Sequence, residues 1–330
     1  MKRNGSLMLS VLVGIVFLCF LSAPGARAEF PERPITLINP QAPGGANDVL
    51  ARPYTQIVEK YLGQPVVVVN KPGASGMIAN VAGAQAAPDG YTLTIGSSLM
   101  TIVMEWEKIS GKEPPAYISD FAPVGVLSTI PTVLSVPYAS PWKTITELIN
   151  EVKANPGKYT FVSAGLRSPT HLGAERFIKA LGLKCRHVPY KGGGPALQAL
   201  VGGHGDFTTQ FSLTSIPLHR GNKLRILAVQ NSERLKSIPD IPTMREAGIQ
   251  NIENGMWLGI VAPKNTPSAI LEKLRDATAE TVKDPAYIQA IQAVGEEVRP
   301  MGGSELAKHW ALESESISRL LKELAKEGMK

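Results

Sequence analysis

The chain has 330 residues, a formal net charge of +6, two cysteines and 44% hydrophobic residues. This length is enough for a large core or for two domains. No run of Lys and Arg exceeds two residues, and no basic patch alternates with aromatic residues, so nucleic acid is not an expected partner.

The first 28 residues predict a cleaved secretory signal peptide. Lys2 and Arg3 precede an uncharged apolar stretch over 7–23, and an A-x-A cleavage pattern ends at Ala28. An uncleaved membrane anchor is the alternative, although the stretch is at the short end of what spans a bilayer. We therefore expect cleavage after Ala28, export to the periplasm and a mature chain of about 300 residues.

Strand-like and helix-like segments alternate along the rest of the chain. The expected strands are 35–39, 66–70, 92–95, 160–163, 184–189 and 223–230. The expected helices are 47–62, 77–86, 145–155, 170–181, 194–201, 267–283, 285–294 and 304–327. This alternation predicts an α/β fold with doubly wound, mainly parallel sheets.

Residues 121–136 form an extended segment long enough to cross between two domains, and 223–230 is a candidate return crossing. We therefore expect two lobes around a cleft, because clefts between domains are favoured ligand sites. The first lobe is expected to be discontinuous, and the predicted boundaries are 29–127 and 231–330 for lobe 1 and 128–230 for lobe 2.

Three loops rich in Gly and Ser follow predicted strands, at 43–48, 96–98 and 163–171. In an open α/β sheet the carboxyl ends of the strands line the ligand crevice. Free backbone N–H groups and hydroxyls in such loops bind anions, so the pattern predicts capture of a small acid. The alternative is that these loops are rich in Gly and Ser for steric reasons alone.

The sequence offers little support for catalysis, metals or nucleotides. It has no G-x-S-x-G elbow, no G-x-G-x-x-G and no complete P-loop, and its five histidines lack metal-ligand spacing. His171 is expected either to contact the ligand or to fix the neighbouring backbone. Cys185 is expected to be a packing residue. An exported hydrolase stays the alternative, and it requires a Ser–His or Cys–His pair within hydrogen-bond reach.

Several stretches spread over the chain resemble the periplasmic solute receptors of tripartite tricarboxylate transporters, the Bug-type receptors. They include PERPITLINPQAPGGANDVLAR (31–52), LGQPVVVVNKPGASGMIA (62–79), HVPYKGGGPALQALVGGHGDF (187–207) and IPDIPTMREAG (238–248). The resemblance implies a type II periplasmic-binding-protein fold, in which two doubly wound lobes are joined by two hinge strands. It also implies no enzyme activity, no cofactor and no metal.

The resemblance further implies that the protein binds a small carboxylate and delivers it to the membrane components of a tripartite transporter, with the receptor itself a monomer. The implied ligand-binding residues are Pro43, Gly44, Gly45, Asn47 and Asp48 in the first loop, Ser163, Ala164, Ser168 and His171 in the loop of the second lobe, and Gln210. The strand-end pattern adds Ser97 and Ser98.

The chain also departs from the family pattern. Gln41-Ala42 replaces a common Phe-Pro, Leu166-Arg167 stands where glycine is usual, Gln210 replaces an acidic residue, and residues 99–116 fit poorly. These departures leave the identity of the carboxylate open, and a sensory ligand-binding protein remains an alternative to a transport receptor.

Overall fold

The structure is a computed structural model that describes residues 30–41, 43, 46–294 and 296–328. The predicted signal peptide and the predicted site residues Gly44 and Gly45 lie outside the described residues. The chain divides into two units, Met1–Glu32 and Arg33–Lys330, and every element below belongs to the second unit.

Lobe 1 is built on five strands in the order β2-β1-β3-β9-β4. They are β1 (Ile35–Asn39), β2 (Val66–Asn70), β3 (Thr92–Ser97), β9 (Gly255–Pro263) and the first part of β4 (Phe121–Pro137). β1 pairs in parallel with β2 and β3, whereas β9 is antiparallel to both β3 and β4. The two-residue β10 (Met301–Gly302) adds to β4 in antiparallel orientation.

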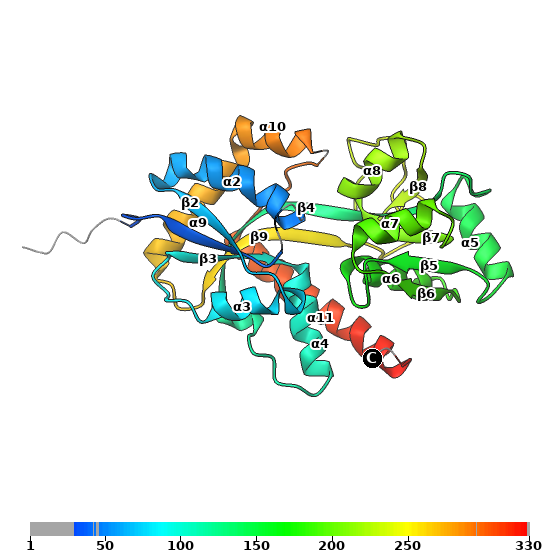
Figure 1. Cartoon of the computed structure of the whole chain (residues 1–330), viewed down its shortest axis with the longest axis horizontal. Coiled ribbons are helices and arrows are strands. Elements are labelled where there is room, and N and C mark those ends of the chain that lie inside the picture. Colours follow the sequence, from blue (N-terminus) through cyan, green and yellow to red (C-terminus); the bar gives the residue numbers. More distant parts are fainter. Residues whose placement is uncertain (1–29, 42, 44–45, 295, 329–330) are drawn as a thin grey trace, which may run out of the picture. The chain divides into compact units, whose positions relative to one another are not determined.

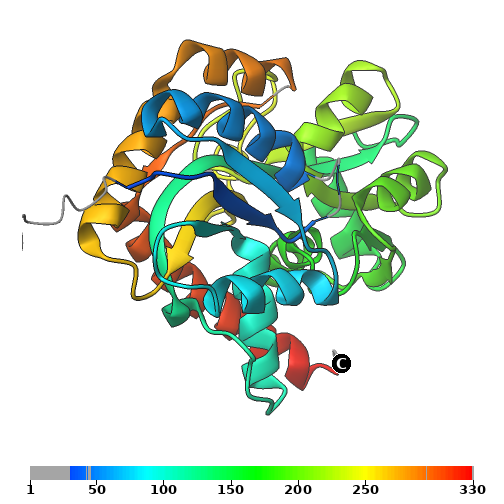
Figure 2. The same cartoon turned by 60° about the vertical axis from the view of Figure 1, so that its left-hand side comes forward.

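Helices cover both faces of the lobe 1 sheet (Figures 1 and 2). On one side lie α2 (Ala46–Leu62), α9 (Ser268–Lys283) and α10 (Pro285–Ala293), and on the other α3 (Met77–Ala84), α4 (Ser98–Ile109) and α11 (Gly303–Lys326). Short 3₁₀ turns precede α3 and β4, at Ala74–Gly76 and Ile118–Asp120. Trp257 of β9 packs edge-on against Trp310 of α11, with ring centroids 5.2 Å apart. Burial of such large apolar rings is a main source of stability in this lobe.

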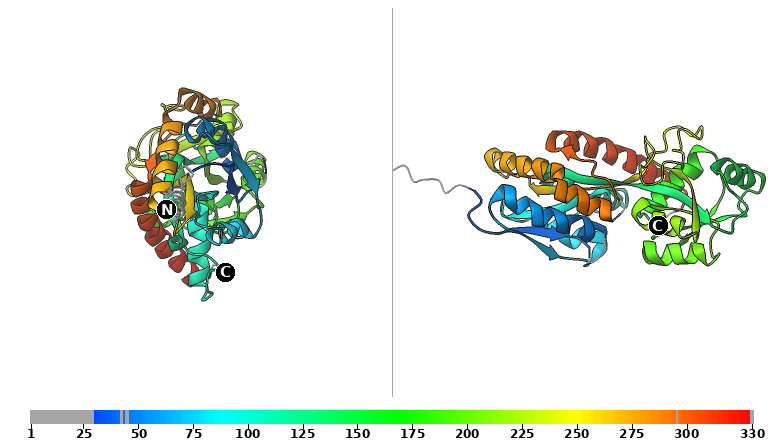
Figure 3. Two further views of the ribbon diagram at one scale, coloured as in Figure 1. Left: turned by 90° about the vertical axis from the view of Figure 1, so that its left-hand side faces the viewer. Right: turned by 90° about the horizontal axis from the view of Figure 1, so that it is seen from above.

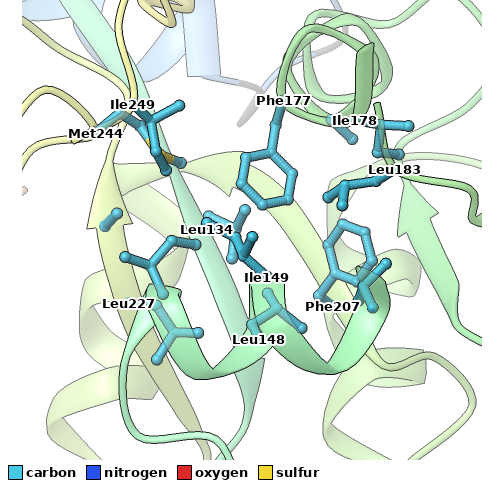
Figure 4. Close-up of a cluster of buried hydrophobic side chains, with 14 of the residues drawn as sticks. Leu134, Leu148, Ile149, Phe177, Ile178, Leu183, Phe207, Leu227, Met244 and Ile249 are labelled. Carbon is cyan, nitrogen blue, oxygen red and sulfur yellow. The ribbon is translucent and has the colours of Figure 1, made fainter. Parts of the chain in front are cut away.

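Lobe 2 repeats the α/β arrangement around the second part of β4. Its strands are β5 (Thr160–Ser163), β6 (Arg186–Pro189), β7 (Phe207–Phe211) and β8 (Leu224–Val229), and its helices are α5 (Ile145–Ala154), α6 (Pro169–Ala180), α7 (Gly193–Val201) and α8 (Ser212–Arg220). Because side chains alternate along a strand, Leu134 and Leu227 join the core beneath α5 and α6 (Figure 4). Val133 and Ile226 join the core beneath α7 and α8.

The lobes are joined by β4, a 17-residue strand that runs through both (Figure 3). β4 pairs with β9 over Phe121–Pro131 and with β7 and β8 over Thr132–Pro137. The return from lobe 2 to lobe 1, which was expected at 223–230, is therefore made by two strands, β8 and β9. Along β4, β8 pairs with the lobe 2 part, over Val133–Pro137, and β9 pairs with the lobe 1 part. The predicted lobe boundaries stay predictions.

The two halves of the return path meet at Thr132. Its N–H donates to Asn254 O and its carbonyl accepts from Gln230 N, both at 2.9 Å. The side chains of Gln230 and Asn254 both hydrogen-bond to Thr132 Oγ1. They also donate to backbone carbonyls of α6, Gly173 O at 2.9 Å and Pro169 O at 3.0 Å. This buried network ties α6 of lobe 2 to the hinge.

None of the helices in the described part of the chain is both long enough and apolar enough to span a bilayer. The longest, α11, has charged residues on its exposed side and an apolar stripe that packs on lobe 1 and on α6. This pattern is typical of a helix with one buried face.

Candidate ligand-binding site

The strand directions turn the predicted loops of the two lobes toward each other. β3 is antiparallel to β9 and β9 is antiparallel to β4, so β1 and β3 run in the same sense as β4, toward lobe 2. β7 is antiparallel to β4, and β5 is parallel to β7, so both run toward lobe 1. The carboxyl ends of β1, β3, β5 and β7 therefore face the region between the lobes, where ligands bind in open α/β sheets.

The carboxylate of Asp48, in the first loop, already accepts hydrogen bonds from other residues of the protein. It is buried in the first turn of α2. Its carboxylate accepts from Asn39 Nδ2 at 3.2 Å and from Arg52 Nε at 2.7 Å. An acidic residue in this place is stabilised by the helix dipole. Asp48 thus anchors the start of α2, whereas Pro43, earlier in the loop, is exposed.

Asn47, beside it, has an unused side chain. The residue is fully buried, and within the described part of the chain neither Oδ1 nor Nδ2 has a hydrogen-bond partner. A buried amide without partners costs free energy and calls for an explanation. A bound ligand that accepts from Nδ2 and donates to Oδ1 would supply those partners.

The loop after β5 is held rigid by its own hydroxyls. Ser168 caps α6, since its Oγ accepts from His171 N at 3.1 Å and donates to Gly165 O at 2.8 Å. Ala164 N donates to Thr170 Oγ1 at 3.0 Å. These bonds fix the loop in advance of any ligand, which lowers the entropy cost of binding.

His171 fixes backbone, one of the two roles expected for it. Its Nδ1 accepts from Arg167 N at 3.1 Å, so a neutral ring carries its proton on Nε2, which faces Glu175 Oε1 at 3.5 Å. The ring also stacks on His187, with centroids 4.1 Å apart.

A Ser–His pair of the kind that the hydrolase alternative requires is present. Ser163 Oγ lies 2.7 Å from His187 Nε2. However, burial, with the neighbouring His171, lowers the pKa of His187 to about 3, which makes it a weak general base near neutral pH. Ser163 is also fully buried and bonds to Gly165. The geometry therefore favours a structural role for this pair.

We expect Ser163 to stay unmodified when the folded protein is incubated with a fluorophosphonate that labels activated serines. The reason is that a base with a pKa of about 3 does not activate the hydroxyl at neutral pH. Intact-mass spectrometry checks the result, with a serine hydrolase as positive control. A covalent adduct on Ser163 would revive the hydrolase interpretation.

The remaining predicted residues lie at two other strand ends. Ser97 ends β3, Ser98 begins α4, and both are buried; Ser98 Oγ accepts from Trp257 N at 3.3 Å. Gln210 lies in β7 and is buried, and its Nε2 has no hydrogen-bond partner in the described structure. A Cβ on Gly193 would lie 3.2 Å from Gln210 Oε1, so a glycine at this position leaves space for the Gln210 side chain. No pattern in the sequence indicated this dependence.

Two of the departures from the family pattern meet in one contact. The guanidinium of Arg167, in the loop after β5, lies over the ring of Trp106 in α4, 4.3 Å from its centroid. Arg167 adopts a left-handed backbone conformation, with φ of 61°, which a non-glycine residue rarely does. The poorly matching 99–116 segment therefore contacts the loop of the second lobe, and the sequence analysis did not predict this contact.

The structure brings Ser163, Ala164, Ser168 and His171 together in one hydrogen-bonded loop. Among the described residues, no hydrogen bond joins that loop to Asn47 or Pro43. Cys185 is half-buried and free, and burial is the main cause that raises the pKa of its thiol to about 11. In the described part of the chain, no cluster of three His, Cys, Asp or Glu side chains is placed to hold a metal ion.

Comparison with known proteins gives a consistent picture. The sequence profile described as "Tripartite tricarboxylate transporter family receptor" matches residues 50–325. The chain is 36% identical to a protein of the UPF0065 group from Bordetella pertussis over 279 residues, which is 84% of this chain and 85% of that protein. It is 33% identical to Protein BugT of the same organism over 292 residues, 88% of this chain and 89% of BugT.

Two solved structures that hold small dicarboxylates are also similar to this chain. MatC from Rhodopseudomonas palustris with bound malate is 30% identical, with a TM-score of 0.73 over 88% of this chain and 100% of that one. A second R. palustris protein, with adipate, is 28% identical, with a TM-score of 0.73 over 89% of this chain and 98% of that one.

Proposed function

Because the chain belongs to the receptor family of the tripartite tricarboxylate transporters, we propose that it is an extracytoplasmic receptor for a small carboxylate. It delivers this ligand to the membrane components of a tripartite tricarboxylate-type transporter and catalyses no reaction. The predicted fold class is confirmed, since the chain has the two-lobed fold of periplasmic solute-binding proteins. The malate and adipate bound to the two neighbours support a dicarboxylate ligand.

The observation that carries the proposal is a pair of unused amides, one in the first turn of α2 in lobe 1 and one in β7 of lobe 2. Asn47 follows β1 of lobe 1, Gln210 lies in β7 of lobe 2, and both have buried polar atoms without partners in the described structure. Asn Nδ2 and Gln Nε2 are hydrogen-bond donors, and hydrogen bonds to a charged acceptor are stronger than neutral ones. One ligand with two carboxylates would accept from Asn47 Nδ2 and from Gln210 Nε2, and a hydroxyl on the same ligand would donate to Asn47 Oδ1.

Capture then proceeds by rearrangement of the lobes about the hinge. Ligand bound between the lobes favours the closed arrangement, because only there do both amides reach it. The unbroken β4 strand and the network at Thr132 keep the two lobes in register during this motion. The protein acts in the periplasm after cleavage of its signal peptide behind Ala28.

A binding screen tests the proposal. Protein that has been unfolded, dialysed and refolded to remove any co-purified ligand is heated with a panel of di- and tricarboxylates, and we expect at least one to raise the Tm, because ligands that bind only the native state stabilise it. Calorimetry then gives the Kd for the acid found.

Two variants connect that binding to the amides. We expect Asn47→Ala and Gln210→Ala each to weaken binding about tenfold or more, the usual cost of losing a hydrogen bond to a charged group. The matched controls are Asn150→Ala and Gln198→Ala, which alter exposed residues of α5 and α7. The proposal fails if no acid stabilises the folded protein, or if the two variants bind as the controls do.

A further inference from the structure

A cavity of about 340 Å³ lies at the hinge, where both lobes contribute to its wall. Pro131 of β4 and Met256 of β9 form the hinge side. Leu172 and Arg176 come from α6 of lobe 2, and Ser316 comes from α11. Of the described residues predicted to bind the transported ligand, only Ser98 lines this cavity.

Arg176 brings a poorly compensated positive charge into the cavity. Its Nη1 donates to the neutral hydroxyl of Ser316 at 3.0 Å, and its Nε is buried without a partner. Burial lowers the pKa of Arg176, and the charge of the nearby Glu313 partly offsets this effect. Among the ion pairs of the described residues, none includes Arg176. Arg176 is half-buried, and a desolvated cation without an ion-pair partner is costly, so a negatively charged group beside it would stabilise the protein.

Glu313, Gln230 and Asn254, three other polar residues of the wall, already hydrogen-bond to groups of the protein. Glu313 Oε2 accepts from Trp257 Nε1 at 2.8 Å and from Thr101 Oγ1 at 3.0 Å. Gln230 and Asn254 are held in the network around Thr132. Glu253 and His309 also line the wall, and Glu253 is exposed. Arg176 supplies the permanently positive donor of the wall, next to Ser316 and Glu313 of α11, and Leu172 and Ile317 line the cavity from α6 and α11.

The apolar part of the wall determines what kind of anion fits. Leu172 follows Pro169 and precedes Arg176 on one face of α6, at the three- and four-residue spacing of a helix. Ile102 of α4, Ile317 of α11 and Met256 of β9 add further apolar surface. A fully hydrated inorganic anion would leave these side chains without contacts.

We propose that this hinge cavity is a second ligand site, which binds a small organic anion through a carboxylate on Arg176 and an apolar body against Leu172 and Ile317. The site itself does not depend on the proposed transport function. An occupant contacts both lobes and both sides of the hinge, so it changes the relative stability of open and closed arrangements. By linkage it alters affinity at the transport loops, and the transported ligand alters its affinity by the same factor.

The first test uses 3-bromobenzoate, an aromatic carboxylate whose bromine gives anomalous scattering. Crystals of the protein grown with the probe are measured at the bromine absorption edge. We expect a bromine peak in the hinge cavity, with the carboxylate toward Arg176. A peak only near Asn47 and Gln210 would overturn the second site while supporting the proposed function, so the two failures are distinguishable.

Calorimetry with the same probe tests the role of the charge. Arg176→Met keeps the apolar stem and removes the cation, and we expect its affinity for the probe to fall about tenfold or more. Arg176→Lys keeps the positive charge, so its affinity for the probe should fall less. A smaller loss in Arg176→Lys than in Arg176→Met shows that the charge, and not only the structure of the wall, contributes to binding. Arg319→Met is the matched control, because Arg319 is exposed on α11.

Two results would overturn the proposal. One is equal affinity of Arg176→Met and the wild type for 3-bromobenzoate. The other is a bromine peak in the crystal without any calorimetric difference between these proteins, which would mean binding at crystal concentration only. Thermal unfolding of each variant without the probe shows whether it is folded before its affinity is compared.

Discussion

Replacement of Gly173 by alanine is expected to lower the free energy of unfolding by roughly 3 kcal/mol, although alanine is normally the better helix former. A Cβ at this position of α6 would lie 2.6 Å from Asn254 Nδ2, 2.9 Å from Gln230 Oε1 and 3.0 Å from Thr209 Oγ1. The side chains of these three residues hydrogen-bond to Thr132 Oγ1 or to backbone carbonyls of α6, and displacing them leaves donors and acceptors unpaired. Urea unfolding followed by circular dichroism measures the change.

The matched control is Gly194→Ala, where the added Cβ meets nothing within 4 Å at the start of α7. It should be neutral or slightly stabilising, because alanine loses less backbone entropy than glycine. Gly173→Ala should also weaken ligand binding, since the network that it displaces connects α6 to the hinge. Equal free energies of unfolding for the two variants would contradict the prediction, because the network would then accommodate the added Cβ without loss of stability.

The second large effect is expected from pH, through Glu296. This side chain, between α10 and β10 of lobe 1, is buried, and its Oε1 accepts from Ser212 Oγ at 2.9 Å at the start of α8 in lobe 2. Burial raises its pKa from 4.5 to about 7. The hydrogen bonds from Ser212 and from the backbone of Leu213, and the charge of Arg299, oppose that rise, whereas Glu297 adds to it.

A carboxyl group whose pKa is higher in the folded protein than in the unfolded chain binds protons more tightly when folded. Its contribution to stability is therefore fully present below pH 4.5 and is lost as the pH rises through about 7. We expect the wild type to lose roughly 3 kcal/mol over this interval relative to Glu296→Gln, which carries no charge at any pH. Denaturant unfolding across this interval measures the difference.

The comparison with Glu296→Gln isolates this group from others that titrate in the same range. His187 has the opposite sign, because its lowered pKa makes stability fall as the pH drops below 6.5. Glu305→Gln, an exposed glutamate of α11, is the matched control and should follow the wild-type curve. Parallel curves for the wild type and Glu296→Gln would refute the prediction.

The elements with clear periodicity were predictable from the sequence. Strands 35–39, 66–70 and 160–163 appear with the expected bounds, and most helices differ by one or two residues at an end. These segments have one buried face, so their patterns of apolar residues follow the geometry of the element. The same patterns and turn residues were enough to indicate the α/β class.

Two of the elements that the sequence analysis missed are buried in ways that remove such a pattern. α4 (Ser98–Ile109) packs against α3, α6 and α11, and its buried residues include Ser98, Thr101 and Glu105 as well as apolar ones. β7 (Phe207–Phe211) is a central strand whose middle residues are polar, and Thr208 and Thr209 satisfy their hydroxyls on Val162 O and Thr170 O. Hydrophobic alternation therefore identifies neither element.

The candidate site, too, could be predicted only in part from the sequence. Loop chemistry pointed to residues at strand ends, and the strand directions place those ends opposite each other. The sequence did not separate residues that hold the loops, such as Asp48 and Ser168, from those with unused polar atoms, such as Asn47 and Gln210. That distinction depends on partners from other segments, which only the folded chain brings together. Whether these residues bind the ligand stays a prediction.

The half-buried thiol of Cys185 has a practical consequence for measurement. With its pKa raised to about 11, little of it is the reactive thiolate at neutral pH. A cysteine introduced at an exposed position, such as Leu166 beside the Arg167–Trp106 contact, would react with a maleimide dye far faster. The receptor is thus suited to become a fluorescent reporter of its own ligand, with the natural thiol left in place.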